Sequence, residues 1–141
     1  MRWILWSMML TVTLLTPSLG SAADDGRHCT EASLEGDWGF TLSGTVTPAP
    51  AVTPAAAVGI FTVDRVGNVS GRDTVSANGT VLQETFSGTL IVNPDCTGSA
   101  TLDSSIVGET HLDFVLVAKK KEILLIRKDP GIVLFGSAQQ Q

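Results

Sequence analysis

The sequence has few basic side chains and few of the residues that build common catalytic or metal sites. It carries nine lysine and arginine residues against 14 aspartate and glutamate residues, only two histidines and two cysteines. An acidic chain with no basic face is a poor partner for nucleic acid or for anionic lipid, so we expect neither. Zinc, P-loop and dinucleotide-binding motifs are absent from the sequence, so we expect no metal and no cofactor.

A long hydrophobic run occurs at the N-terminus, and it predicts export. Arg2 forms a short positive region, residues 3–15 are apolar, and residues 17–23 contain helix breakers and small residues that suit a signal peptidase. We expect cleavage after Ala23, with Ala22 as the alternative, and release to the periplasm or the medium. The run is shorter than the ~20 residues of a transmembrane helix, although an uncleaved anchor is the alternative interpretation.

Removal of the signal peptide leaves one small acidic domain. Because Arg2 leaves with residues 1–23, the remaining 118 residues carry eight basic and 14 acidic side chains, a net charge of −6. This length is enough for one domain with one core. We expect no membrane insertion of this mature chain, and the sequence leaves its oligomeric state open. The predicted parts are a signal peptide at 1–23, an N-terminal extension at 24–35, a β-domain at 36–137 and a disordered tail at 138–141.

The two cysteines predict one disulfide. In an exported chain, Cys29 and Cys96 favour a structural bond over a metal or catalytic pair. The bond would tie the N-terminal extension to the turn at residues 93–95. In the chain-entropy model, a loop of this length stabilises the fold by about 4 kcal/mol.

Turn signals divide the mature chain into eight short segments of alternating apolar residues. No segment after residue 23 has helical periodicity, and a composition rich in glycine, threonine, valine and serine suits strands and turns. The basic run at 119–121 is interpreted as a solvated hairpin tip. The predicted strands are 38–46, 57–64, 69–77, 80–92, 98–102, 110–118, 122–128 and 132–136.

Short connections predict an antiparallel meander. Consecutive strands should therefore pair as neighbours, and eight such strands can close into an up-and-down barrel without exposed edges. We predict an all-β, antiparallel, eight-stranded β-barrel, which is either filled by side chains or holds one small ligand. A two-sheet sandwich is the alternative, and it would need crossover connections. A membrane-spanning barrel is disfavoured, because the strands are short and aromatic girdles are absent.

One connection is long: residues 47–56, which read TPAPAVTPAA. Its prolines remove hydrogen-bond donors and favour extended polyproline-like backbone, so we do not expect a strand there. Two interpretations stay open. The segment is either a stiff surface loop or a lid over the open end of the barrel that offers alanine and valine to a hydrophobic ligand.

The register of one hairpin can be derived from Asn78-Gly79. Both central positions of a type I′ turn need a positive φ, which Asn-Gly tolerates best. With these two residues in the loop, Asp73 faces Glu84 on the face that also carries apolar side chains, the expected interior. The inward apolar residues predicted to bind a ligand are Phe40, Leu42, Val75, Leu82, Phe86, Leu90 and Phe114.

Asp73 and Glu84 are the candidate catalytic residues. Opposed residues of an antiparallel pair have Cβ atoms ~5 Å apart, so the two carboxyls would share a proton and one pKa would rise. Such pairs serve acid–base chemistry. Two structural alternatives stay open: a bulge at Gly71 or a flipped face turns both side chains to water, or Arg127 or Arg65 neutralises them in an ion pair.

The segment Gly36-Asp37-Trp38 opens the first predicted strand soon after a cysteine. This G-x-W arrangement resembles the first motif of lipocalins and related calycin barrels, which have eight strands and a long first loop that forms a lid. The layout is equally similar to that of allene oxide cyclase-like barrels. The lipocalin resemblance implies that Trp38 closes the base of the barrel and that a late arginine, here Arg127, packs across it in a cation–π contact.

Three functions of different classes fit these features. We favour an exported carrier of a small hydrophobic molecule. The second is a barrel enzyme that isomerises or cyclises an apolar substrate with Asp73 and Glu84. The third is a structural or interaction module with a filled interior. Because a fold layout does not fix function, the sequence leaves open the ligand and whether the protein is an enzyme.

Overall fold

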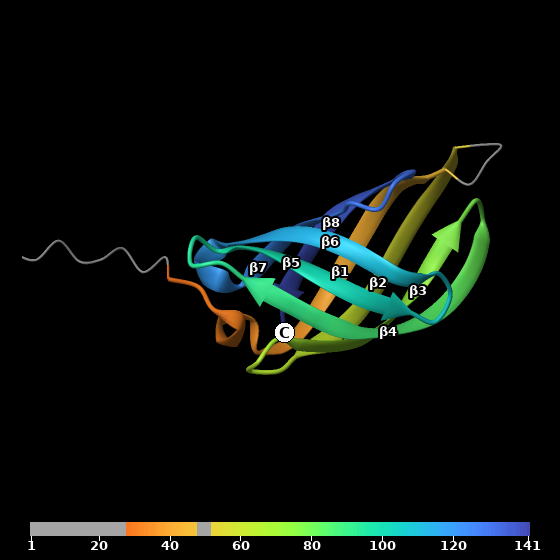
Figure 1. Cartoon of the computed structure of the whole chain (residues 1–141). Helices are drawn as coiled ribbons and strands as arrows, with labels where there is room; N and C mark the ends of the chain where they lie inside the picture. Colours follow the sequence, from red (N-terminus) through yellow and green to blue (C-terminus); the bar gives the residue numbers. More distant parts are fainter. Residues whose placement is uncertain (1–27, 48–51) are drawn as a thin grey trace, which may run out of the picture.

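The computed structural model describes residues 28–47 and 52–141. Within these ranges, eight antiparallel strands follow one another around a closed barrel, and the last strand pairs with the first (Figure 1). The prediction of an up-and-down barrel is therefore confirmed, and the sandwich alternative is wrong. The strands are β1 (Gly36–Val46), β2 (Thr53–Val63), β3 (Asn68–Ala77), β4 (Thr80–Val92), β5 (Thr97–Ser104), β6 (Gly108–Val117), β7 (Glu122–Arg127) and β8 (Ile132–Gln140).

The closing strand β8 is longer than the sequence suggested. It pairs with β1 from Ile132 opposite Val46 to Gln140 opposite Trp38. The prediction of a disordered tail at 138–141 is therefore wrong, because Ala138 is buried in the core and β8 continues to Gln140. The physical reason is closure: β1 would otherwise expose a free edge, and the last residues supply the missing backbone partners.

Strand β2 also begins earlier than expected, at Thr53 instead of residue 57. Pro54 has no N–H group, but it lies opposite Thr45 near the strand end, where a missing donor is tolerated. Its carbonyl oxygen accepts a hydrogen bond of 3.0 Å from the Asn78 backbone N–H. The last part of the predicted loop is therefore strand, and residues 48–51 of the predicted lid lie outside the described residues.

The hairpin between β3 and β4 has the register derived from Asn78-Gly79. Both residues have a positive φ, 51° and 82°. Asp73 pairs with Glu84 and Gly71 pairs with Phe86, with no bulge between them. The alternatives of a shifted register or a flipped face are therefore wrong, and the hairpin presents its apolar side to the interior.

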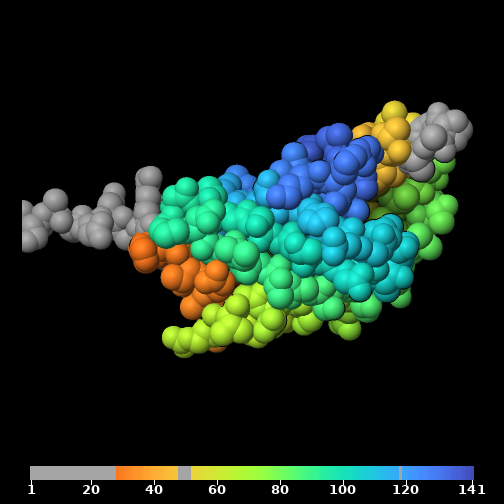
Figure 2. Space-filling view, viewed as in Figure 1, coloured from red at the N-terminus to blue at the C-terminus, as the bar shows by residue number. Residues whose placement is uncertain are grey.

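One end of the barrel is closed by η1 (Glu31–Leu34), a short 3-10 helix that precedes β1. Leu34 and Trp38 are fully buried, and the Trp38 indole Nε1–H donates a hydrogen bond of 2.9 Å to the Leu34 carbonyl oxygen. In the space-filling view this segment, in orange, lies against the end of the barrel (Figure 2). In the described part of the chain, no helix is long and apolar enough to cross a membrane.

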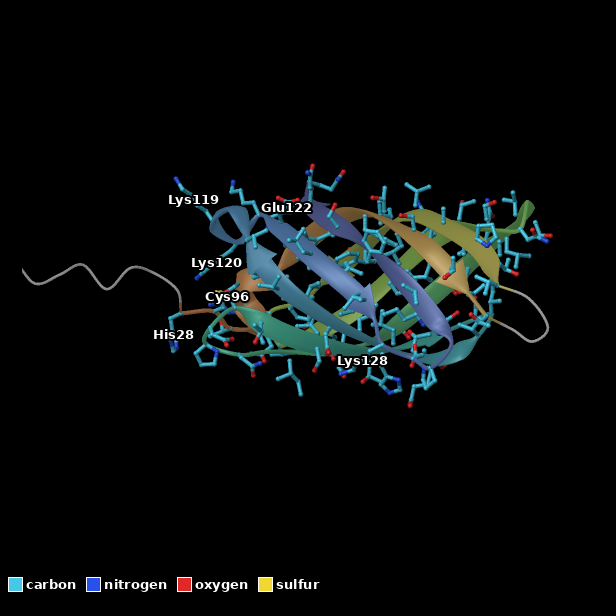
Figure 3. The ribbon with its side chains drawn as sticks, turned by 90° about the horizontal axis from the view of Figure 1, so that it is seen from above. His28, Cys96, Lys119, Lys120, Glu122 and Lys128 are labelled. Carbon is cyan, nitrogen blue, oxygen red and sulfur yellow. A yellow bond between two sulfur atoms is a disulfide. The ribbon has the colours of Figure 1, made fainter. Side chains whose placement is uncertain are left out.

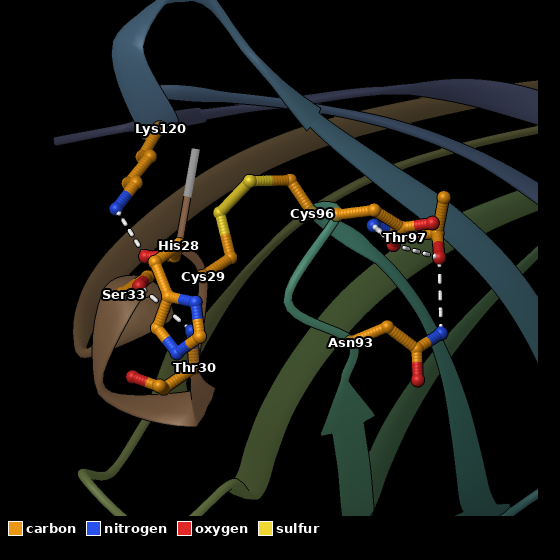
Figure 4. Close-up of a disulfide and its surroundings, with 9 residues drawn as sticks. His28, Cys29, Thr30, Ser33, Asn93, Cys96, Thr97 and Lys120 are labelled. Carbon is orange, nitrogen blue, oxygen red and sulfur yellow. Dashed lines mark hydrogen bonds between the residues drawn. A yellow bond between two sulfur atoms is a disulfide. The ribbon is translucent and has the colours of Figure 1, made fainter. Parts of the chain in front are cut away.

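The predicted disulfide is confirmed and lies at the closed end. Cys29 and Cys96 are bonded, with their Cα atoms 5.0 Å apart (Figure 4). The Cys29 backbone N–H donates a hydrogen bond of 3.2 Å to the Pro94 carbonyl oxygen, so the bond ties η1 to the β4–β5 turn as expected. Lys120, in the short turn η2 (Ala118–Lys120), donates a hydrogen bond of 2.9 Å to the His28 carbonyl oxygen at the same end (Figure 3).

Glycines on the inner wall make room for aromatic rings. A Cβ atom on Gly71 would lie 2.4 Å from Cζ of Phe86, and one on Gly98 would lie 2.3 Å from Cζ of Phe114. Each ring therefore lies across a glycine of the neighbouring strand, with which it is paired. The rings are held against the wall, and the axis of the barrel stays open.

This packing predicts that Gly71→Ala destabilises the barrel. The added methyl group would force Phe86 off its position, and such overpacking costs about 1–3 kcal/mol of unfolding free energy. Urea unfolding should show this loss, whereas Ser70→Ala, at an exposed outward position of the same strand, should change the value by less than about 0.5 kcal/mol. Equal stability of the two variants would contradict the role given to Gly71.

Candidate functional site

The barrel interior contains a cavity of about 530 Å³. Leu34 of η1 and Ile123 of β7 form its floor at the closed end, and Thr47, Val107 and Pro130 lie at its mouth, next to the turns of the other end. Most lining side chains are aliphatic or aromatic. Sites for small molecules usually measure roughly 300–1,000 Å³ and are mainly apolar, so this cavity has the size and character of one.

All the side chains predicted to bind a ligand line this cavity. An aromatic row begins at the floor, where Trp38 stacks on Phe61, and continues through Phe40, whose ring centroid lies 6.0 Å from that of Phe86. Leu82 is 42% exposed because it lies near the mouth. The predicted residues on the lining are Phe40, Leu42, Val75, Leu82, Phe86, Leu90 and Phe114.

Asp73 and Glu84 also point into the cavity. They lie on adjacent strands, directly opposite each other, between Leu82 at the mouth and Phe86 further in. Asp73 is only 9% exposed. Gly59 on β2 lies on its other side, and a Cβ there would come within 2.4 Å of the Asp73 Cβ. Because Gly59 has no side chain, there is room beside it for the Asp73 side chain.

The hydroxyl of Ser104 on β5 connects Glu84 to the turn between β5 and β6. The Ser104 hydroxyl accepts the backbone N–H groups of Ile106 and Val107, at 3.1 and 3.2 Å. Its own proton is therefore donated to Glu84 Oε2. Glu84 is therefore held in place by a donor from the neighbouring strand β5.

Asp73 is the carboxyl of the pair whose pKa is raised. Burial, followed by the charge of Glu84 and a hydrogen bond with it, raises the pKa of Asp73 to about 7. Asp73 Oδ1 is buried and has no hydrogen-bond partner among the described residues. Asp73 therefore keeps its proton up to about neutral pH, and its Oδ1 remains an acceptor without a donor among the described residues.

Neither arginine considered from the sequence neutralises this pair. Arg127 lines the cavity, but its Nε–H donates to Asp129 Oδ2 at 2.6 Å. Arg65 is exposed in the β2–β3 turn, at the closed end. The structural ion pair weighed as an alternative is therefore not formed, and the two carboxyls face the cavity without an arginine between them.

The contact between Trp38 and Arg127 implied by the lipocalin resemblance is also not formed. Trp38 lies opposite Gln140, beside the beginning of β7, whereas Arg127 is the last residue of β7 and pairs with Leu112. The length of that strand separates them. Trp38 does lie at the closed end, where it packs on Phe61 and Leu34.

Asp129 organises a polar cluster near the mouth that the sequence did not reveal. It accepts hydrogen bonds from Arg127 and from both the backbone N–H and the Nδ1 of His111, at 3.1 and 2.8 Å. Although partial burial opposes the change, these bonds lower the pKa of Asp129 to about 2. His111 is half-exposed and paired with this carboxylate.

Within residues 28–47 and 52–141, no group of three or more histidine, cysteine or acidic residues is arranged to hold a metal ion. No protein-family model, no curated protein and no solved structure matches the chain. The predicted signal peptide at 1–23 lies outside the described residues.

The raised pKa of Asp73 predicts that stability falls as pH rises. An unfolded aspartate titrates near 3.8 and the folded one near 7, so unfolding releases a proton between these values and the folded state loses stability across that window. From about pH 5 to about pH 8, the unfolding free energy should drop by about 1–4 kcal/mol.

Other carboxyls do not obscure this window. The pKa values of Glu31, Asp64, Asp95 and Asp129 are lowered, so their contributions are lost only below about pH 5. Urea titrations at several pH values should show the fall of the unfolding free energy with pH in the unaltered protein and in Asp103→Asn, an exposed control. Asp73→Asn should remove it; a slope that persists in this variant would show that another group causes it.

Proposed function

We propose that this protein is an exported β-barrel that binds a small hydrophobic ligand in its interior cavity. The observation that carries the proposal is the open space of about 530 Å³, closed at one end by η1 and lined mainly by apolar side chains. Transfer of apolar surface from water into such a space is favourable by about 25 cal/mol for each Å². A filled structural module, the third function considered, would have no such space.

Export rests on the character of residues 1–23 and on the disulfide, which is stable in oxidising compartments. Membership of the lipocalins is a weaker proposal. It is supported by the barrel architecture and by Trp38 at the closed end, and opposed by the distance of Arg127 from that residue.

One observation favours a second candidate, an enzyme. Asp73 and Glu84 face an apolar cavity together, and an acid near neutral pKa is suited to give and take a proton at physiological pH. The chemistry that fits is proton transfer at a carbon next to a carbonyl group, as in an isomerisation. Substrate binding in the same cavity would precede it.

The cavity predicts binding of a neutral apolar dye. N-phenyl-naphthylamine should gain fluorescence with the purified protein, and Ala57→Phe should weaken it about tenfold by removing some 50 Å² of apolar contact. Val58→Phe places the same side chain on the outer face of the same strand and should leave binding unchanged. Absence of dye binding, or equal loss in both variants, would overturn the proposed cavity site.

The enzyme candidate predicts exchange of α-protons in a bound ketone. In deuterated water, the protein should speed deuterium uptake by methyl nonyl ketone, followed by NMR, and Asp73→Asn should lower that rate about 100-fold or more. Dye binding by the same variant shows whether the cavity is intact. Exchange no faster than in buffer alone, with the dye bound, would rule out this chemistry.

A further inference from the structure

The cavity contains a negative charge that no described residue compensates. Among the residues that the structure describes, three ionisable side chains line it: Asp73, Glu84 and Arg127. Arg127 is paired with Asp129 at 2.6 Å, so its charge is already balanced. The carboxyl pair shares one proton and keeps at least one negative charge near neutral pH, next to mainly apolar walls.

The groups around the pair leave this charge in place. Gly59 on β2 has no side chain, and Ser104 on β5 already gives its proton to Glu84. Thr110 on β6 donates to the Leu102 carbonyl oxygen at 3.3 Å. Arg72, next to Asp73 in the chain, does not line the cavity; it shares a second hollow with Asp73 and Glu84, but among the described residues it forms no ion pair with either of them.

The carboxyl pair also includes a hydrogen-bond acceptor that has no donor among the described residues. Asp73 Oδ1 is buried and accepts no hydrogen bond from the described residues. A buried polar atom without a partner, and a partly buried charge without a counter-ion, each cost free energy. A ligand that brings both N–H donors and a positive charge would remove both penalties at once.

Building on the proposed function, we propose that the ligand is a hydrophobic amine whose ammonium group binds between Asp73 and Glu84. The pair lies nearer the mouth than Phe86, so the apolar body extends inward past Phe86 and Phe40 toward Leu34 on the floor. The ammonium donates to Asp73 Oδ1 and to the Glu84 carboxylate. A carboxylate ligand meets like charge at this place, and an alcohol offers one neutral donor.

A series of three ligands with one chain length tests this proposal. Decylamine, decanol and decanoate, below their micelle concentrations, are titrated against dye-loaded protein near neutral pH. The amine should displace the dye about tenfold more effectively than the alcohol, because a charge-assisted hydrogen bond is roughly twice as strong as a neutral one. Decanoate should be the weakest of the three.

Matched variants test whether the preference for the amine depends on the carboxyl pair. The double variant Asp73→Asn/Glu84→Gln, which leaves no carboxyl at this place, should bring decylamine to the affinity of decanol and leave decanol unchanged, whereas Asp103→Asn, which removes an outward carboxylate of β5, should keep the full preference. Near-ultraviolet circular dichroism and dye binding confirm that the variants are folded.

The outcomes separate this proposal from the one on which it rests. If decanol binds as tightly as the amine, if decanoate binds best, or if Asp73→Asn/Glu84→Gln keeps the amine preference, the amine assignment is wrong while the hydrophobic cavity site stands. If the protein binds neither the dye nor any of the three ligands, the proposed function fails and the amine assignment fails with it.

Discussion

The structure depends on the hydrogen bonds between β1 and β8, which turn a meander into a closed ring. Without them, the outer strands would expose unpaired backbone groups and the sheet could open flat. With them, every inward side chain shares one enclosed space. The chemistry of that space follows: apolar side chains from all the strands face one another around two carboxyls, of which Asp73 on β3 is buried and Glu84 on β4 is partly buried.

Much of this arrangement could be predicted from the sequence, because the information is local. The Asn78-Gly79 turn sets its own register, and alternation along each strand then decides which residues face inward. The pairing of Asp73 with Glu84 followed from that count and is present in the structure. Eight apolar segments with short connections likewise indicated a meander, and the disulfide followed from having only two cysteines in the chain.

The features that were missed or wrong depend on partners distant in the sequence. Residues 138–140 have little strand character by themselves and become a strand because β1 needs a neighbour. Ser104 reaches Glu84 across a pairing whose register is set by an irregular turn, in which Cys96 has a positive φ of 71°. Arg127 could be assigned to the floor by resemblance, but its position along β7 places it near the mouth. These contacts join residues that are far apart in the sequence, so the pattern within one segment does not predict them.

The glycines of the inner wall help to determine whether an eight-stranded barrel is filled or hollow, which the number of strands alone does not decide. A barrel of eight strands has an interior just wide enough to be filled by side chains. Here Phe86 and Phe114 lie against Gly71 and Gly98, and a cavity of about 530 Å³ remains in the interior. Filled and hollow barrels of eight strands can therefore differ at only a few wall positions. In this barrel, glycines at such positions leave the space that forms the cavity.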